Sequence, residues 1–186
     1  MNKPDYSAEY AASLWQFANE FYRYAKVKQR LLALQDEHQL NINELLFLLW
    51  YAMRQDAVIT ENQLNQLHAQ GLPWQTKVTE LRQFRRTFCA KLDADDVQAQ
   101  VKADLLRAEL TLERLHLNTL ASAFATEQPL GDSHRELTSL HFLAQENIDA
   151  YVAFNGLPPD SSRRLLLDQL LADWLSLMDS SETLDS

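Results

Sequence analysis

Hydrophobic residues recur along this chain at intervals of three and four, the spacing that places side chains on one side of an α-helix. Near the N-terminus, Leu14, Phe17 and Phe21 fall on one face, and Gln16 and Glu20 fall on the other. The alternation that marks β-strands is almost absent. The pattern predicts α-helices over residues 7–24, 26–38, 42–55, 61–70, 74–92, 94–125, 134–155 and 161–178.

Capping and helix-breaking residues mark several of these boundaries. Asn41 stands three residues before Glu44, and Thr60 stands three residues before Gln63, a spacing typical of a capping box at a helix N-terminus. Gly71 followed by Pro73 predicts a break, because glycine often ends a helix and proline has no amide hydrogen to donate. We therefore expect residues 61–70 and 74–92 to form separate helices.

The segment 45–53 is apolar on almost every side, so the helix that contains it has to be enclosed by others. The sequence predicts an all-α fold, a compact and mainly antiparallel bundle of seven to eight helices with one long central helix at about 94–125. We expect residues 1–125 to form a helical core and residues 126–178 to form two C-terminal helices packed on it. Residues 179–186 are expected to be a flexible acidic tail.

Charge and cysteine content restrict the classes of partner and compartment. The net charge of −9 argues against binding to nucleic acid or to an anionic membrane surface, since both need a basic surface. The longest apolar run is too short to cross a bilayer, so no membrane insertion is predicted. Cys89 is the only cysteine, which excludes an internal disulfide and favours a cytoplasmic location.

Three ionisable residues interrupt the apolar pattern of the long helix. Glu109, Glu113 and His116 lie between two apolar stripes at about 100° per residue, on a side that we expect to face other helices. One stripe contains Val97, Val101, Leu105, Ala108, Leu112 and Leu115, and the other contains Leu106, Leu110, Leu117, Leu120 and Phe124. Burying a carboxylate without partners is costly, so counter-charges, donors, a metal or water are expected beside these residues.

The helix predicted at 74–92 offers such partners. Arg85 falls near the middle of its apolar side, which carries Trp74, Val78, Leu81, Phe84, Phe88 and Leu92, and Arg82 falls at the edge. Guanidinium groups suit paired carboxylates because they form two parallel hydrogen bonds and stay charged. Asn43 is a candidate third donor.

Three interpretations of this polar cluster stay open: an ion-pair network that fixes helix register, a pocket for a ligand or partner, and a metal site. Glu113 and His116 form a Glu-x-x-His sequence, which di-iron helical bundles use on two helices. Only one copy occurs here, so we predict no metal ligand and no cofactor. No glycine-rich phosphate loop or nucleophile elbow occurs either, and we assign no catalytic residue.

The C-terminal helix has a broad apolar side that can contact a partner or a second copy, or can fold back on the bundle. The candidate contact residues are Leu167, Leu170, Leu171, Trp174 and Met178.

Several short motifs occur in a fixed order along the first two thirds of the chain. They are Trp15-Gln16-Phe17-Ala18, Leu34-Gln35-Asp36, Asn43 with Leu45-Leu46-Phe47 and Trp50, Leu81-Arg82 with Arg85-Arg86, and Glu109-Leu110 with Glu113-Arg114. As a set they resemble an uncharacterised family of small all-helical proteobacterial proteins. The resemblance implies a helical fold and no specific activity.

Two functions from different classes are therefore kept. The first is a non-catalytic cytoplasmic interaction or regulatory protein that contacts another protein or a second copy. The second is an enzyme or small-ligand binder, with or without a metal, built on Glu109, Glu113, His116, Arg82 and Arg85. The absence of a catalytic motif favours the first.

Overall fold

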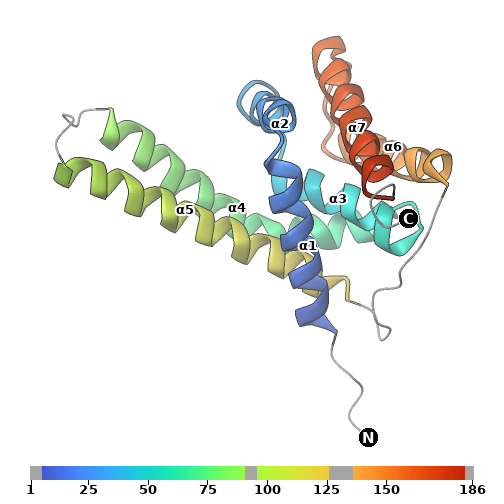
Figure 1. Cartoon of the computed structure of the whole chain (residues 1–186), viewed down its shortest axis with the longest axis horizontal. Helices are drawn as coiled ribbons and strands as arrows, with labels where there is room; N and C mark the ends of the chain where they lie inside the picture. The colour runs from blue at the N-terminus through green and yellow to red at the C-terminus, as the bar shows by residue number, and fades with distance from the viewer. Residues whose placement is uncertain (1–5, 91–95, 126–135, 183–186) are drawn as a thin grey trace, which may run out of the picture.

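The computed structural model describes residues 6–90, 96–125 and 136–182. Seven α-helices contain most of these residues and no strand occurs among them, which confirms the predicted all-α fold (Figure 1). The helices are α1 (Ser7–Tyr22), α2 (Ala25–His38), α3 (Ile42–Gln55), α4 (Glu61–Cys89), α5 (Asp96–Ala123), α6 (Leu137–Phe154) and α7 (Ser161–Glu182).

Helix α3 forms the centre of the core, because it is apolar nearly all round and packs against α1, α2, α5 and α6. The ring centroids of Phe47 and Phe124 lie 4.8 Å apart. Trp50 lies edge-on to Tyr10, with 5.8 Å between their ring centroids. Asn41 caps its N-terminus by accepting hydrogen bonds from two backbone amides of the first turn. The enclosed helix predicted at 42–55 therefore has a defined N-terminal end.

The structure joins the helices predicted at 61–70 and 74–92 into the single helix α4, so the predicted break is wrong. Helical spacing of the buried residues continues across Gly71 and Pro73: these are Leu64, Leu67, Gly71 and Val78. Gly71 does not end the helix but lets α5 approach, since a Cβ there would lie only 2.7 Å from His116 Nε2. Packing against α5 thus outweighs the cost of about 3 kcal/mol that proline imposes in a helix interior. Thr60 and Gln63 form the predicted capping box at the start of α4.

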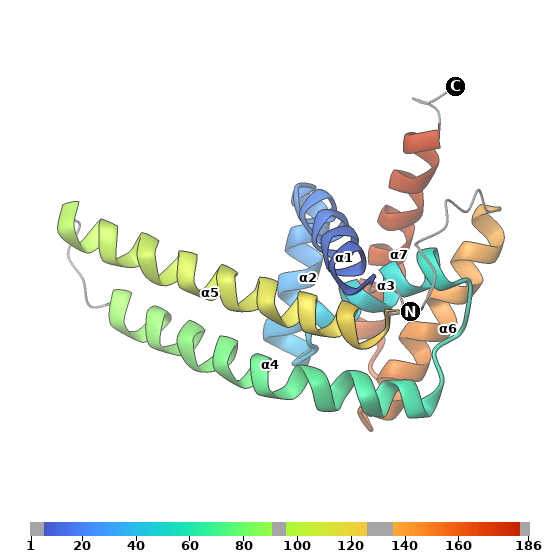
Figure 2. The same cartoon turned by 90° about the horizontal axis from the view of Figure 1, so that it is seen from below.

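Helices α4 and α5 form a long antiparallel hairpin whose outer half extends beyond the other helices (Figures 1 and 2). The long helix α5 is central only through its C-terminal part, where Leu117, Leu120, Ala121 and Phe124 are buried. No residue from 97 to 108 is buried. The outer half of α5 is stabilised by its helix propensity and by its contact with α4.

The two C-terminal helices pack on the rest of the chain, α6 against α3 and α7 against α2 and α6. This packing buries Leu167, Leu170, Leu171 and Trp174 and partly buries Met178. Four of the five residues expected as a partner contact are therefore covered within the chain, and Met178 is covered in part. Helix α7 runs to Glu182 and includes the first part of the expected acidic tail. Residues 183–186 lie outside the described residues, and so do residues 126–135, which include the predicted start of the helix at 134–155.

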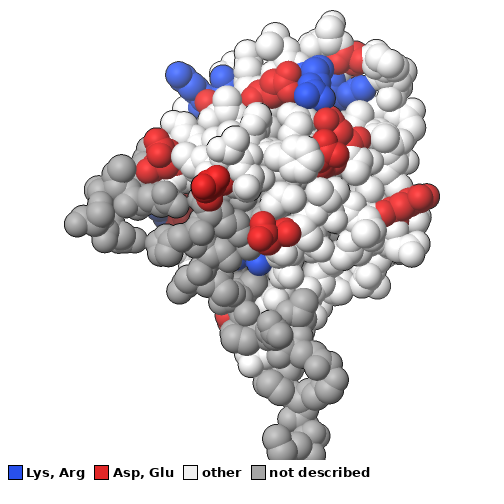
Figure 3. Space-filling model, turned by 90° about the vertical axis from the view of Figure 1, so that its right-hand side faces the viewer, with Lys and Arg blue, Asp and Glu red and all other residues white. Residues whose placement is uncertain are grey.

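Charges on the side of the molecule that carries α6 and α7 are dispersed (Figure 3). Arg164 pairs with Asp149 at 2.7 Å and with Asp168 at 2.8 Å, and Arg30 pairs with Asp173. Arg164 and Arg30 are thus neutralised by acidic neighbours. Within the described ranges, no helix is both long and apolar enough to cross a membrane.

Candidate functional site

The structure brings Arg82 and Arg85 of α4 against Glu109 and Glu113 of α5 in one hydrogen-bonded network. Arg82 donates from Nε to Glu109 at 2.7 Å and from Nη2 to Glu113 at 2.5 Å. Arg85 donates from Nε to the second oxygen of Glu109 at 2.7 Å. Both oxygens of Glu109, which is only 4% exposed, are therefore satisfied by guanidinium groups.

The two carboxylates of the network differ in their electrostatics. Burial opposes ionisation of Glu109, but hydrogen bonds from Arg85 and Arg82 outweigh it and lower the pKa of Glu109. Burial raises the pKa of Glu113, and the charge of Arg82 opposes this rise only in part. Burial, together with the charge of Glu113, raises the pKa of the nearby Tyr22 to about 12. The network is thus centred on Glu109 and holds it ionised.

His116 points away from this network and interacts with Asn43 at the N-terminus of α3. The Asn43 side-chain amide lies 3.0 Å from His116 Nδ1 and 3.5 Å from the backbone oxygen of Glu113. When Asn43 donates to Nδ1, the imidazole carries its hydrogen on Nε2, an atom that is buried without a partner. Burial lowers the pKa of His116 to about 4, so the ring is neutral at physiological pH.

Behind His116 lies a second polar group that the sequence did not reveal, centred on Glu44. Glu44 is 1% exposed, and burial raises its pKa although Tyr151 hydrogen-bonds to it. Its Oε1 is buried without a hydrogen bond and lies 3.9 Å from Nδ1 of His68. A Cβ on Gly71 would approach this Oε1 to 3.1 Å. Glycine at position 71 therefore makes room for both Glu44 and His116.

Sequence reasoning missed Glu44 and Gly71 because each also fits a local role. The Glu44 backbone amide does donate to the Asn41 cap, at 3.4 Å, but its side chain turns into the core instead of completing a capping box. Gly71, followed by Pro73, matched the sequence pattern of a helix end. The spacing of seven between Leu64 and Gly71, and again to Val78, was the one sequence feature that indicated a buried position.

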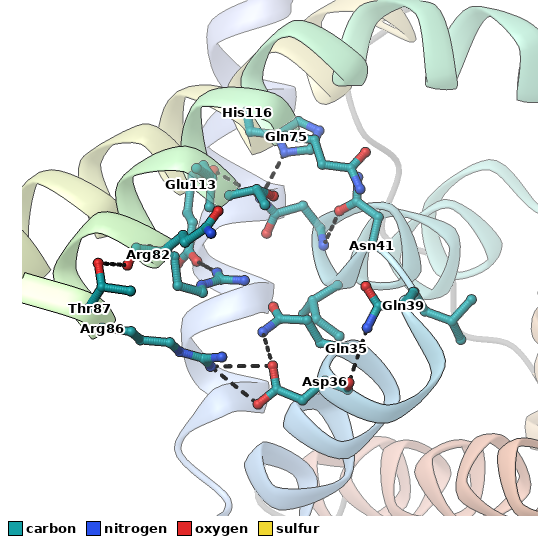
Figure 4. Close-up of a pocket in the computed structure, with 16 residues that line it drawn as sticks. Gln35, Asp36, Gln39, Asn41, Gln75, Arg82, Arg86, Thr87, Glu113 and His116 are labelled. Carbon is teal, nitrogen blue, oxygen red and sulfur yellow. Dashed lines mark hydrogen bonds and ion pairs between the residues drawn. The ribbon is translucent and has the colours of Figure 1, made fainter. Parts of the chain in front are cut away.

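A cavity of about 490 Å³ opens between α2 and α4 beside these groups (Figure 4). Glu113 and His116 contribute to its wall from α5, and Asn41 and Asn43 from the start of α3. Most of the remaining wall is uncharged and polar: Gln35, Gln39, Gln75, Thr79, Gln83 and Thr87. Arg86, also in the wall, pairs with Asp36 of α2 at 3.2 Å.

The Glu-x-x-His sequence does not place its two side chains together. Glu113 turns to Arg82, and His116 turns to Asn43. Across residues 6–90, 96–125 and 136–182, no group of three or more His, Cys, Asp or Glu residues has a geometry that could hold a metal ion.

Comparison with known proteins places the chain in a family. No curated protein and no solved structure matches it significantly. Residues 13–120, more than half of the chain, match a family described as "Protein of unknown function (DUF2390)". This segment contains the Arg82–Glu109 network, His116 and Glu44, whereas Tyr151 and α7 lie outside it. The chain therefore belongs to this family of proteins of unknown function, in agreement with the expected membership of an uncharacterised family.

Proposed function

We propose that this protein is a non-catalytic interaction protein of the cytoplasm and that one face of the α4–α5 hairpin is its contact surface. The observation that carries the proposal is a set of exposed and half-buried apolar side chains at helical spacing. We define the hairpin face as Trp74, Leu81, Phe84 and Phe88 of α4 with Val97, Val101, Leu105, Ala108, Leu112 and Leu115 of α5. None of these residues is buried.

The hairpin face lies on the side opposite α1 and α2. Those helices cover the inner part of the other side, where Arg114 of α5 sits 5.0 Å above the Trp15 ring and Arg86 of α4 pairs with Asp36. Helical phase turns Phe84 and Phe88 of α4 and Val97 of α5 to the side opposite these contacts. Phe84 is 52% exposed and Val97 is 73% exposed.

The largest exposed apolar patch of a protein, typically a few hundred Å², is often a functional contact surface. Burying such a patch stabilises an interface by about 25 cal/mol per Å². The groups in the hairpin that could support chemistry, Glu109 and Arg82 with their partners, are instead satisfied by one another. This favours a binding role for the hairpin over catalysis.

The partner that we propose is a second copy of the chain. Two hairpins related by a two-fold axis form a four-helix bundle, for which the face needs only to be complementary to itself. Charges beside the face do not oppose this, because Lys77 pairs with Glu80 at 2.9 Å and Arg107 pairs with Asp104 at 2.7 Å.

The expected strength of dimerisation follows from the size of the hairpin face. At 1.5 Å per residue, the stretch from Val97 to Leu115 is about 27 Å long, and two adjacent helices are about 20 Å wide. Each copy then contributes roughly 500 Å², and the total of about 1,000 Å² is near the lower limit for a specific interface. We therefore expect a dimer that dissociates at low concentration.

Sedimentation velocity from low to high micromolar concentration tests the proposal. The double variant Phe84→Ser/Phe88→Ser should be monomeric with an unchanged helical circular dichroism spectrum. The matched control is Phe142→Ser, since Phe142 is 60% exposed but lies on α6. A wild-type protein that stays monomeric at the highest concentration, or a control that dissociates equally, would refute the proposal.

A further inference from the structure

We infer that the junction of α3, α4 and α5 encloses a binding site for a single water molecule, held by Glu44, His68 and His116. Neither Glu44 nor His68 lines the cavity between α2 and α4, so this site is separate from it. Three observations carry the inference: a convergence of buried polar atoms, the hydrogen-bonding capacity of those atoms, and the close approach that Gly71 permits.

Three buried side-chain atoms without a hydrogen bond converge at this junction: Oε1 of Glu44, Nδ1 of His68 and Nε2 of His116. Glu44 Oε1 lies 3.9 Å from His68 Nδ1, which is beyond hydrogen-bond distance. Glu44 Oε1 and His116 Nε2 lie 3.1 and 2.7 Å from the position that a Cβ on Gly71 would occupy. A buried polar atom without a partner is costly, so three such atoms in one place indicate a shared bridging partner.

The hydrogen-bonding capacity of the three atoms selects that partner. Because Asn43 donates to Nδ1 of His116, Nε2 carries the ring hydrogen and donates. Tyr151 donates to Glu44, but Oε1 takes no part in this bond and stays an acceptor. A water molecule can accept from Nε2 and donate to Oε1, and it can bond to Nδ1 of His68 in either tautomer. Buried waters typically make about three hydrogen bonds of this kind.

Other occupants do not match these atoms. A cation would meet the positive end of the N–H group of His116, and an anion would meet the carboxyl group of Glu44. Among the residues that the structure describes, no group of His, Cys, Asp and Glu side chains could hold a metal ion. Leu120 bounds the site on an apolar side, with Cδ2 at 3.3 Å from the Cβ position on Gly71. The site is therefore too small for a molecule much larger than water.

The water joins the helices of the junction through one polar path. His116 of α5 reaches Glu44 of α3 through the water, and Glu44 reaches the backbone amide of Asn41 through the hydroxyl group of Tyr151 on α6. Glycine at position 71 of α4 keeps this path open, because a Cβ there would crowd both Glu44 Oε1 and His116 Nε2.

A high-resolution crystal structure of the full-length protein tests the site directly. We expect an electron-density peak about 2.7–3.2 Å from all three atoms, with no anomalous signal of a metal. Water-selective NOE spectroscopy should also show a long-lived contact between water and the Nε2 hydrogen of His116. The inference is overturned if His68 or His116 bonds directly to Glu44 Oε1 with no density between them, or if the peak is a metal ion.

Magnetic relaxation dispersion of the water signal counts long-lived internal waters in solution. Gly71→Ala should hold one such water fewer than the wild-type protein, because the added Cβ crowds the site. His116→Leu removes the donor without changing α4 and should also lose one water. Gln70→Ala is the matched control, since Gln70 is an exposed neighbour of Gly71, and it should keep the wild-type number. Equal numbers in the wild-type protein and in either folded site variant would overturn the inference.

Discussion

Replacing Glu109 with alanine should lower the free energy of unfolding by about 3 kcal/mol. The change removes two charge-assisted hydrogen bonds, and each such bond contributes about 1.5–3 kcal/mol. Arg82 keeps Glu113 as a partner, whereas Arg85 loses its carboxylate. Because the two arginine side chains are 18% and 19% exposed, water can rehydrate them in part. We therefore place the loss at the lower end of the roughly 3–5 kcal/mol typical of a broken buried pair.

Urea denaturation followed by circular dichroism at 222 nm measures this loss, which corresponds to a fall in Tm of about 6–12 °C for a domain of this size. Glu113→Ala should cost less, about 1–2 kcal/mol, because Glu113 accepts a single bond in the network and is more exposed. Glu80→Ala is the control: Glu80 pairs only with the exposed Lys77, and its removal should change stability by less than about 0.5 kcal/mol. A loss for Glu109→Ala no larger than that for Glu80→Ala would refute the idea that the network clamps α4 to α5.

Two further predictions concern the group around His116. Gly71→Ala should destabilise the protein by about 1–3 kcal/mol despite the better helix propensity of alanine, because its Cβ would meet His116 Nε2 at 2.7 Å. Urea denaturation beside the exposed control Gln70→Ala measures this, and equal stability of the two variants would contradict the close approach. Acidification should also remove stability through His116: its folded pKa of about 4 lies below the ordinary 6.5, so the unfolded chain binds the proton first and stability falls as pH drops from about 6.5 to about 4. An NMR titration that gives the His116 ring a pKa near 6 would show that burial does not have this effect.

The Arg–Glu network could be predicted from the sequence because helical periodicity and complementary charge both indicate it. The positions of Glu109 and Glu113 within an apolar pattern require that they face another helix, and Arg82 and Arg85 occur on a neighbouring helix of complementary charge. These arguments need only periodicity and the cost of an unpaired buried charge. The same periodicity predicted the helices themselves, including the enclosed helix α3.

Glu44 and Gly71 were beyond such reasoning because their roles depend on which helices meet. A glutamate three residues after Asn41 satisfies the local rule for a cap, and only the packing of α4 and α6 beside it turns its environment into core. Likewise, Gly71 and Pro73 satisfy the local rule for a break. The contact with His116 that overrides this rule joins residues far apart in the sequence.

The apolar stripe from Val97 to Leu115 shows a different limit, because periodicity specifies that a face is to be buried but not by which chain. Within the hairpin, part of the seam between α4 and α5 is occupied by the ion pairs of Glu109, so the apolar positions beside it do not have to fill that seam. They point outward on the side away from α1 and α2. An ion-pair clamp also fixes the register of the two helices, which a face shared by both helices requires if its residues are to align with a partner. The charged seam and the exposed apolar face are thus two consequences of one arrangement: polar contacts in the seam help to hold the hairpin together, and the hydrophobic surface is left exposed for the association that we propose.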